Sequence, residues 1–213
     1  MKRGEQFEAS LPRTDYFSEG YFDIRQLMAQ MMQIKYIHDL KPRSIIEIGI
    51  GNGLTSTFIR NSGIDILTAD INPNLNPDIC CPISEVVDAI RGRKFDLVVC
   101  CEVLEHTPLD QLEMNIRTLR TLGNRLFLTL PGYTKSFGVS GVIKFPWLKA
   151  RDFFVHIFLP KNEDLALTEH FWEVGSERAT HRGAIVAVLK KHYTKVRTGR
   201  MSFQPNQIYF IAE

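Results

Sequence analysis

The chain has 213 residues, of which 44% are hydrophobic and 23% charged, and its formal net charge is +2. This composition predicts one ordinary globular domain with a sizeable core, and it excludes a disordered chain. The faint basic lean is too small to indicate a nucleic-acid partner.

The first part of the chain predicts an arm and a helix. Residues 1–20 show no clear period, and their role is open. Asp23 opens a capping-box pattern, and the apolar residues after it recur at helical spacing until the helix should end before Pro42. We expect residues 1–40 to form an N-terminal arm and a helix that covers one face of a sheet, ahead of a main domain at residues 41–213.

The stretch from Ser44 to Thr55 reads as a buried strand that runs into a glycine-rich turn and a helix. Three alternating glycines, Gly49, Gly51 and Gly53, allow backbone angles and close approaches that a Cβ would block. The helix after them points its amide ends at whatever lies over the turn. We expect a nucleotide site here; the alternative is a tight strand-to-helix turn that binds nothing.

The glycine spacing separates two kinds of nucleotide site. A dinucleotide fingerprint, Gly-x-Gly-x-x-Gly, would need its last glycine where Leu54 stands. The sequence instead reads Glu47-x-Gly49-x-Gly51-x-Gly53, which resembles the first motif of class I S-adenosylmethionine (SAM)-dependent methyltransferases of the type 11/23-like group. In that family the glycines pack against the methionyl and ribose part of SAM. The resemblance implies that Glu47 and the three glycines contact this cofactor.

A second strand is expected over residues 65–70, and it ends in a carboxylate. Asp70 lies about twenty residues past the glycine turn, the distance at which such a carboxylate accepts hydrogen bonds from ribose hydroxyls. The alternative role is that of a turn-initiating Asp. Together with the first motif, the ribose role is the better interpretation, with Ile71 and Asn72 lining the adenosine beside it.

The third strand departs from the family pattern. Residues 77–82 predict a short strand, and a short helix should follow from Ser84 to Arg91. Methyltransferases of this kind often place a carboxylate near the end of the third strand, against the adenine amino group. Cys80 and Cys81 occupy those places here, so we expect backbone groups at one of them to take the adenine contact.

The fourth strand, from Phe95 to Cys101, leads into residues of chemical interest. The run Phe-Asp-Leu-Val-Val with Glu-Val-Leu-Glu-His after it resembles the fourth motif of class I methyltransferases. Open α/β sheets bind ligands at the carboxyl ends of their strands, so Glu102 and His106 should face the crevice. Thr107 and the proline after it then predict the start of a helix that continues to Gly123.

A fifth strand is expected over residues 125–131, and residues 133–170 then break the pattern with many aromatics among Gly, Pro and Lys. We interpret this segment as a cap inserted over the substrate, with its aromatics packed on the domain. The competing interpretation is an amphipathic, membrane-touching piece between Lys144 and Lys161.

The last part of the chain predicts the closing elements of the fold. Thr168 to Gly175 resembles a His-x-Trp-Glu-(Ile/Leu/Val)-Gly segment of uncharacterised methyltransferases of this class, and Ser176 can cap the next helix. Residues 193–200 and 207–212 alternate as two final strands. We expect an α/β, Rossmann-like methyltransferase fold with a doubly wound, mostly parallel seven-stranded sheet, an antiparallel last strand and a small inserted cap.

The cysteines and termini indicate the compartment. The four cysteines form two adjacent pairs, whereas a disulfide framework would need spaced partners. A zinc site would need C-x-x-C spacing or nearby histidines, so we expect no metal. There is no apolar signal region at the N-terminus and no run of roughly 18 apolar residues that could span a membrane. We expect a cytoplasmic protein.

Methyl transfer from a sulfonium needs little acid–base work, because the leaving group is already activated. Orientation of the acceptor therefore supplies much of the acceleration. An acceptor that must lose a proton needs a base, for which His106 is the first candidate and His170 the second. The structural alternatives are that His106 braces the following helix and that His170 orients Trp172.

We therefore expect a SAM-dependent methyltransferase whose unidentified acceptor is a small or amphipathic molecule, because there is no separate recognition domain and no basic stripe. One alternative is a non-catalytic SAM-binding or scaffold protein. The other is a nicotinamide-dependent oxidoreductase, which Leu54 disfavours. No nucleic-acid partner is expected, and the oligomeric state is open.

Overall fold

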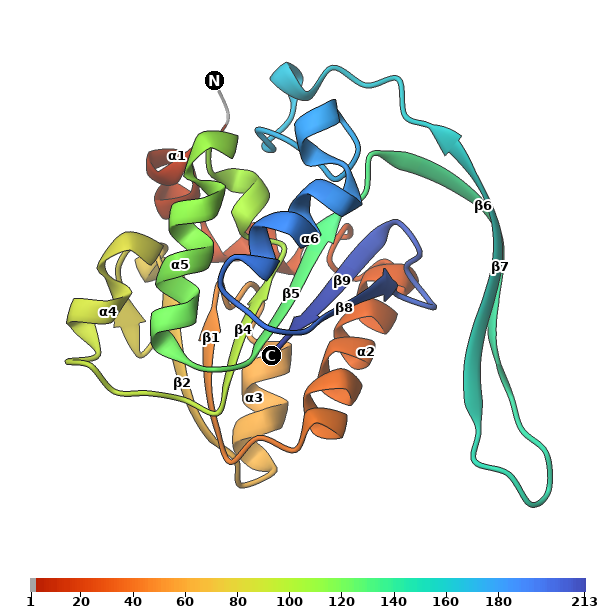
Figure 1. Cartoon of the computed structure of the whole chain (residues 1–213), viewed down its shortest axis with the longest axis horizontal. Coiled ribbons are helices and arrows are strands. Elements are labelled where there is room, and N and C mark those ends of the chain that lie inside the picture. The colour runs from red at the N-terminus through yellow and green to blue at the C-terminus, as the bar shows by residue number, and fades with distance from the viewer. Residues whose placement is uncertain (1–2) are drawn as a thin grey trace.

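A seven-stranded sheet in the order β3-β2-β1-β4-β5-β9-β8 forms the centre of the computed structural model, which describes residues 3–213 (Figure 1). Its strands are β1 (Ser44–Ile48), β2 (Asp65–Asp70), β3 (Ile79–Cys80), β4 (Leu97–Cys101), β5 (Leu126–Pro131), β8 (Val196–Arg200) and β9 (Gln207–Ala212). The first five pair in parallel, whereas β9 runs antiparallel to both β5 and β8. The predicted doubly wound, mostly parallel sheet with an antiparallel last strand is confirmed.

Helices cover both faces of this sheet. They are α1 (Glu5–Ser10), α2 (Ile24–Leu40), α3 (Leu54–Asn61), α4 (Val86–Ala89), α5 (Leu112–Leu122) and α6 (Arg182–Lys190). Successive side chains of a strand point to opposite faces, so Ile45 packs with α2 and α3 whereas Ile46 packs with α4, α5 and α6. The central strands are therefore apolar on both sides, and Ile34 and Ile37 of α2 pack on one of these faces.

Two helix starts differ from the sequence prediction. The helix expected from Thr107 begins at Leu112, because Pro108 is extended and two short 3-10 turns, η4 (Leu104–His106) and η5 (Leu109–Gln111), come first. The last helix is capped by His181, whose side chain accepts a hydrogen bond from the Ala184 amide. Ser176 was expected to cap it, but the 3-10 turn η7 (Arg178–Thr180) lies between them.

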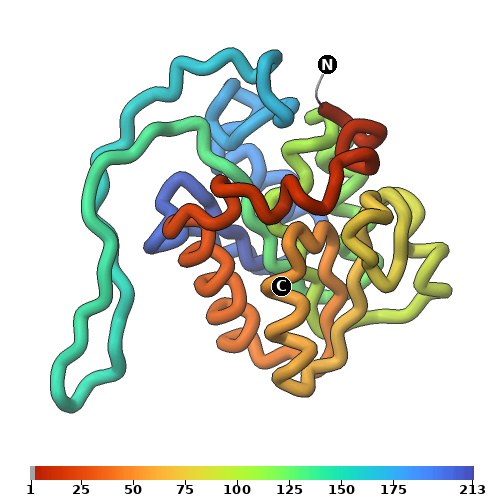
Figure 2. The backbone as a smooth tube through the Cα atoms, turned by 180° about the vertical axis from the view of Figure 1, so that it is seen from behind, coloured from red at the N-terminus to blue at the C-terminus, as the bar shows by residue number. Residues whose placement is uncertain are grey.

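The N-terminal arm crosses the molecule close to the carboxyl ends of the parallel strands (Figure 2). It comprises α1 and the 3-10 turn η1 (Arg13–Phe17), and it contains no fully buried side chain. The buried Asn72 donates its side-chain amide to the carbonyl of Leu11, 2.9 Å away. This bond ties the arm to the loop after β2.

The segment expected to form a cap is a long hairpin that projects away from the sheet (Figures 1 and 2). It consists of β6 (Thr134–Ile143) and β7 (Arg151–Pro160), which pair antiparallel as a separate two-stranded sheet. Phe137 is 77% exposed and Trp147 is 89% exposed. The prediction that the aromatics pack on the domain is therefore wrong. None of the helices within residues 3–213 is long and apolar enough to cross a lipid bilayer.

Candidate active site

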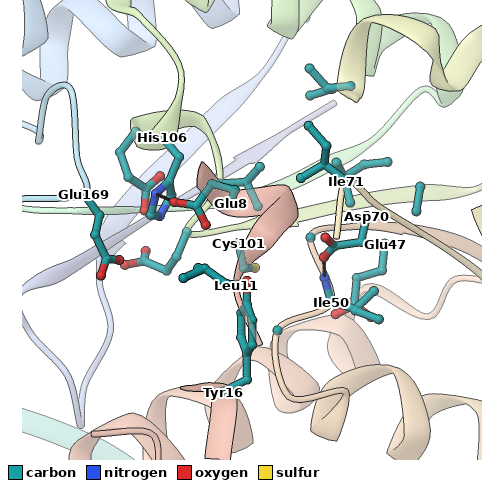
Figure 3. A pocket seen from close by; sticks show the side chains of 18 of the residues that line it. Glu8, Leu11, Tyr16, Glu47, Ile50, Asp70, Ile71, Cys101, His106 and Glu169 are labelled. Atoms are coloured by element: carbon teal, nitrogen blue, oxygen red, sulfur yellow. Dashed lines mark hydrogen bonds and ion pairs between the residues drawn. The ribbon is translucent and has the colours of Figure 1, made fainter. Parts of the chain in front are cut away.

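A cavity of about 460 Å³ lies at the carboxyl ends of β1, β2 and β4, under the N-terminal arm. The glycine turn and Asp70 lie on one side of it, and His106 and Glu169 lie on the other (Figure 3). Leu11 and Tyr16 of the arm lie between the two sides. The cavity therefore brings together residues from three strand ends and from a segment with no readable sequence pattern.

Each of the three positions in the turn requires glycine for a different physical reason. A Cβ on Gly49 would lie 2.3 Å from the Val103 side chain, so this position needs glycine for packing. Gly51 has a φ of +52°, lines the cavity and would point a Cβ into space with no atom within 4 Å. Gly53 has a φ of +75° and begins the α3 helix, away from the cavity wall. Gly51 is thus the glycine that leaves room for a ligand.

Asp70 is fixed against the glycine turn by two backbone amides. Its Oδ2 accepts from the Ile50 amide and its Oδ1 from the Asn72 amide, both at 2.8 Å. Burial raises the pKa of Asp70 and these bonds lower it, with the rise prevailing. Of the two predicted neighbours, Ile71 lines the cavity, whereas Asn72 is buried outside it and holds the arm.

Two further carboxylates face the cavity with incomplete hydrogen bonding. Burial raises the pKa of Glu47 to about 8, and its Oε2 has no hydrogen-bond partner among the described residues. Glu102 is held at a φ of +55°, a conformation that costs free energy for any residue with a side chain. Burial, together with the charge of Glu105, raises the pKa of Glu102. Buried polar atoms without partners are typical of ligand sites.

Cys81 lines the cavity, but its backbone amide is already used in a hydrogen bond. This N–H donates to the carbonyl of Asp70 at 3.1 Å, as part of the pairing between β2 and β3. The next residue, Pro82, has no N–H to offer. The adenine contact predicted for Cys80 or Cys81 therefore stays a prediction. The Cys81 amide is not free to donate to the adenine ring.

The two histidines predicted from separate motifs lie side by side. The rings of His106 and His170 are 5.0 Å apart, edge to face. Two bonds between their segments explain this approach: the Phe171 amide donates to the Glu105 carbonyl at 2.8 Å, and the Trp172 indole donates to the Thr107 carbonyl at 3.0 Å. Trp172 is thus a buried side chain that holds the two segments together.

His106 is paired with a carboxylate of the N-terminal arm. Its Nδ1 lies 2.9 Å from a carboxylate oxygen of Glu8 in the arm. Burial lowers the pKa of His106, but the bond to Glu8 and the charge of Glu105 outweigh burial and raise it to about 9. A protonated imidazole has no lone pair with which to take a proton. This contact weakens the prediction of His106 as the first candidate base.

His170 has a different partner. Its Nδ1 lies 2.9 Å from the carboxylate of Glu173, which also accepts from the ammonium of Lys161 at 2.9 Å. Burial raises the pKa of Glu173, but the bonds from His170 and Lys161 outweigh burial and lower it. In a neutral imidazole, a carboxylate at Nδ1 favours the proton on that nitrogen and leaves Nε2 as the acceptor.

Glu105 is a member of the site that the sequence prediction missed. It is 0% exposed, and neither of its carboxylate oxygens has a hydrogen-bond partner among the described residues. Glu105, His106 and His170 each offer one ligand atom, all within 4.8 Å of one another. Such a set could hold a metal ion only after His106 has lost its proton, and the sequence predicts no metal here. Glu105 is recognised as a member of the site only by its burial, which no sequence motif predicts.

Comparisons with known proteins agree with this fold. Residues 19–177 match a family model described as a methyltransferase domain. The chain is 16% identical to magnesium protoporphyrin IX methyltransferase (ChlM) from Synechocystis PCC 6803, solved with bound S-adenosylhomocysteine, over 98% of this chain and 96% of that one, with a TM-score of 0.60. Streptomyces venezuelae DesVI is 12% identical, over 95% and 98% of the two chains, with a TM-score of 0.57.

Curated sequences give a shorter match. Ubiquinone biosynthesis O-methyltransferase from Coxiella burnetii is 26% identical over 46% of this chain and 49% of its own length. The chain thus spans about half the length of the curated relatives that it matches.

Proposed function

Because the chain belongs to the methyltransferase-domain family, we propose that it binds SAM over Gly51 and transfers the methyl group to a small or amphipathic acceptor in the same cavity. Family membership supports the predicted SAM-dependent methyltransferase class, and it gives no support to the nicotinamide-dependent alternative. The site residues and the acceptor class are our proposals.

The observation that carries the acceptor class is one cavity that holds both halves of the site (Figure 3). At about 460 Å³ it falls within the range of roughly 300–1,000 Å³ that small-molecule sites occupy. The arm lies over it, so a macromolecular acceptor would have to displace Leu11 and Tyr16 to enter. Two of the similar proteins are named for ubiquinone and magnesium protoporphyrin IX, which are small organic molecules.

The residues fit SAM in kind. Asp70 and Glu47 would supply acceptors for the ribose hydroxyls and the methionyl amino group, and Gly51 would leave the space above the turn open. When bound, SAM supplies a methyl group on a positively charged sulfur. The described residues then have to orient the acceptor toward that methyl and exclude water, and the arm over the cavity serves the second purpose.

For an acceptor that must lose a proton, we assign His170 ahead of His106, which reverses the order expected from the sequence. Support comes from the partners of the two rings. The Glu173 carboxylate at Nδ1 of His170 is also neutralised by Lys161. For His106, burial is outweighed by Glu8 and Glu105, which together raise the pKa to about 9. Glu173 is then a positioning residue. Replacing it by Gln should lower kcat and shift the pH profile of turnover, with KM for SAM unchanged. A Glu173→Gln variant with an unchanged pH profile would overturn this role.

Incubation of the protein with SAM carrying a radioactive methyl group tests the acceptor class. Cell extract is separated by size into small molecules and macromolecules, and each fraction is supplied alone. Label should enter the small-molecule fraction with wild type and be lost with Gly51→Val. Label confined to macromolecules would refute the acceptor class. SAM binding without transfer to either fraction would favour the non-catalytic alternative.

The cytoplasmic location expected from the sequence stays a prediction, which fractionation of cells with an antibody against the chain would check.

A further inference from the structure

The hairpin of β6 and β7 has one apolar face, and this face is exposed, whereas an ordinary surface hairpin buries its apolar face. Paired residues of antiparallel strands share a face, and every second pair lies on the same side. The register places Phe137 opposite Ile157 and Val139 opposite Val155, and Phe153 and Leu159 share their face. These six apolar side chains are all exposed. The apolar face of the hairpin therefore points to solvent.

The other face of the hairpin is turned toward the domain. The guanidinium of Arg200 in β8 stacks over the Phe158 ring, 3.9 Å from its centre, and Ser202 donates to the Asp152 carboxylate. The remaining side chains on this face include Ser136 and His156, which are only partly exposed. The contacts to β8 and to the loop after it orient the hairpin, so the outward position of the apolar face is built into the fold.

The turn of the hairpin combines apolar and basic side chains. Phe145, Trp147 and Leu148 are all exposed at its tip. Lys144, Lys149 and Arg151 flank them, and with Lys135 at the far end the hairpin carries four cations. Its single anionic side chain, Asp152, accepts a hydrogen bond from the Ser202 hydroxyl. Aromatic side chains beside lysine and arginine are typical of segments that lie at a membrane–water interface.

The charge pattern distinguishes between possible occupants of this face. In a dimer built by pressing two hairpins together, cations would meet cations in either direction, because both ends of the hairpin are basic. Like charges in contact oppose association. A bilayer with anionic headgroups instead offers complementary charge at its surface and an apolar layer beneath it.

We propose that the hairpin of residues 134–160 is a membrane-docking element that lays its apolar face into the headgroup region of an anionic bilayer. Trp147 and Phe145 enter the interface at the tip, and Lys144, Lys149 and Arg151 contact the headgroups. The proposal does not depend on the identity of the methyl acceptor. It brings the enzyme to a lipid surface without a membrane-spanning segment among the described residues.

Vesicle flotation tests this proposal with the full chain. Wild-type protein should float with vesicles of phosphatidylcholine and phosphatidylglycerol and stay behind with phosphatidylcholine alone. Each cation near an anionic surface is worth about 1 kcal/mol, or about fivefold in affinity. The double variant Lys144→Glu, Lys149→Glu should therefore bind at least about 25-fold more weakly, whereas Lys190→Glu on α6 should bind like wild type.

The two tryptophans of the chain provide an independent readout. Trp147 is 89% exposed and Trp172 is 1% exposed, so only Trp147 can change its surroundings on docking. Its emission should shift to the blue with anionic vesicles, and the shift should be lost in Trp147→Phe. Phe145→Ser should weaken flotation, whereas Phe58→Ser, which removes an exposed phenylalanine from α3, should not. The hairpin variants should bind SAM with wild-type affinity in calorimetry. This control would show that the variants are folded.

Three results would overturn the proposal. The first is absence of flotation with both kinds of vesicle. The second is equal flotation with neutral and anionic vesicles, which would remove the role of the cations. The third is a dimer in light scattering that Phe145→Ser dissociates, which would assign the apolar face to a second copy of the chain.

Discussion

Nδ1 of His106 lies 2.9 Å from the carboxylate of Glu8, and this contact joins the end of β4 to the N-terminal arm. Both side chains are largely buried, so the pair is little screened by solvent. The arm is held by this charge interaction on one side of the cavity, and by the hydrogen bond from Asn72 to the Leu11 carbonyl at the loop after β2. The arm thus forms part of the wall of the candidate site.

Removal of the Glu8 charge should release the proton of His106. In Glu8→Gln the pKa of His106 should fall from about 9, because the bond to Glu8 is the largest of the effects that raise it, whereas burial and the charge of Glu105 remain. Titration of the histidine ring signals by NMR measures this. Glu5→Gln, on the same helix but without an ion pair to this histidine, should leave the pKa unchanged. An unchanged pKa in Glu8→Gln would show that the pair does not form in solution.

The same pair predicts a pH dependence of stability. Since the folded pKa of His106 is raised, its stabilising contribution is fully present below about pH 6.5 and is lost as the pH rises through about 9. Glu8→Gln should therefore lower the free energy of unfolding at pH 7 more than at pH 10. Urea unfolding at the two pH values measures the difference, and an equal effect at both would contradict the pairing.

Glu47 predicts a second pH effect with the same sign. Its buried carboxyl has a pKa of about 8, so the stability of the SAM-free protein should fall as the pH rises from about 5 to about 8, by at most about 1.4 kcal/mol per pH unit. Glu47→Gln should lack this loss and be more stable than wild type near pH 8, because the amide stays neutral. Glu19→Gln on the surface should follow wild type. Parallel stability curves for wild type and Glu47→Gln would rule out a neutral Glu47.

The arm should control how long SAM stays bound. Asn72→Ala removes the buried amide that holds Leu11, and the loss of one such bond costs about 1 kcal/mol. SAM should therefore dissociate about five times faster, as measured by stopped-flow displacement. Asn74 also donates to Leu11, but it is exposed, so Asn74→Ala should have a smaller effect. Equal dissociation rates in wild type and Asn72→Ala would separate the arm from SAM retention.

Local patterns were sufficient to predict the sheet, and they brought to notice the residues on one side of the candidate site. The strand ending in Glu47, the glycines after it and Asp70 lie close together in sequence, and parallel strands bring their carboxyl ends to one edge. His106 and His170 were each found by motif, but their contact depends on the bond from Phe171 to Glu105, which links segments far apart in the chain.

The sequence could not predict contacts made by segments that have no helical or strand periodicity. Glu8 belongs to an arm with no readable period, so its approach to His106 could not be anticipated. In the hairpin the alternation of Phe137 and Val139 with small residues was readable as strand, but burial of apolar residues is the usual outcome, and it led to the wrong expectation of a packed cap.

The most direct test of the SAM site is calorimetry with Gly51→Val. The side chain would enter the space above the turn and should weaken SAM binding by about 1–3 kcal/mol, roughly tenfold or more. Gly63→Val is the matched control, since Gly63 also has a positive φ and open space around it but lies outside the cavity. The proposed site predicts loss of SAM affinity in Gly51→Val alone. Equal SAM affinity in wild type, Gly51→Val and Gly63→Val would contradict it.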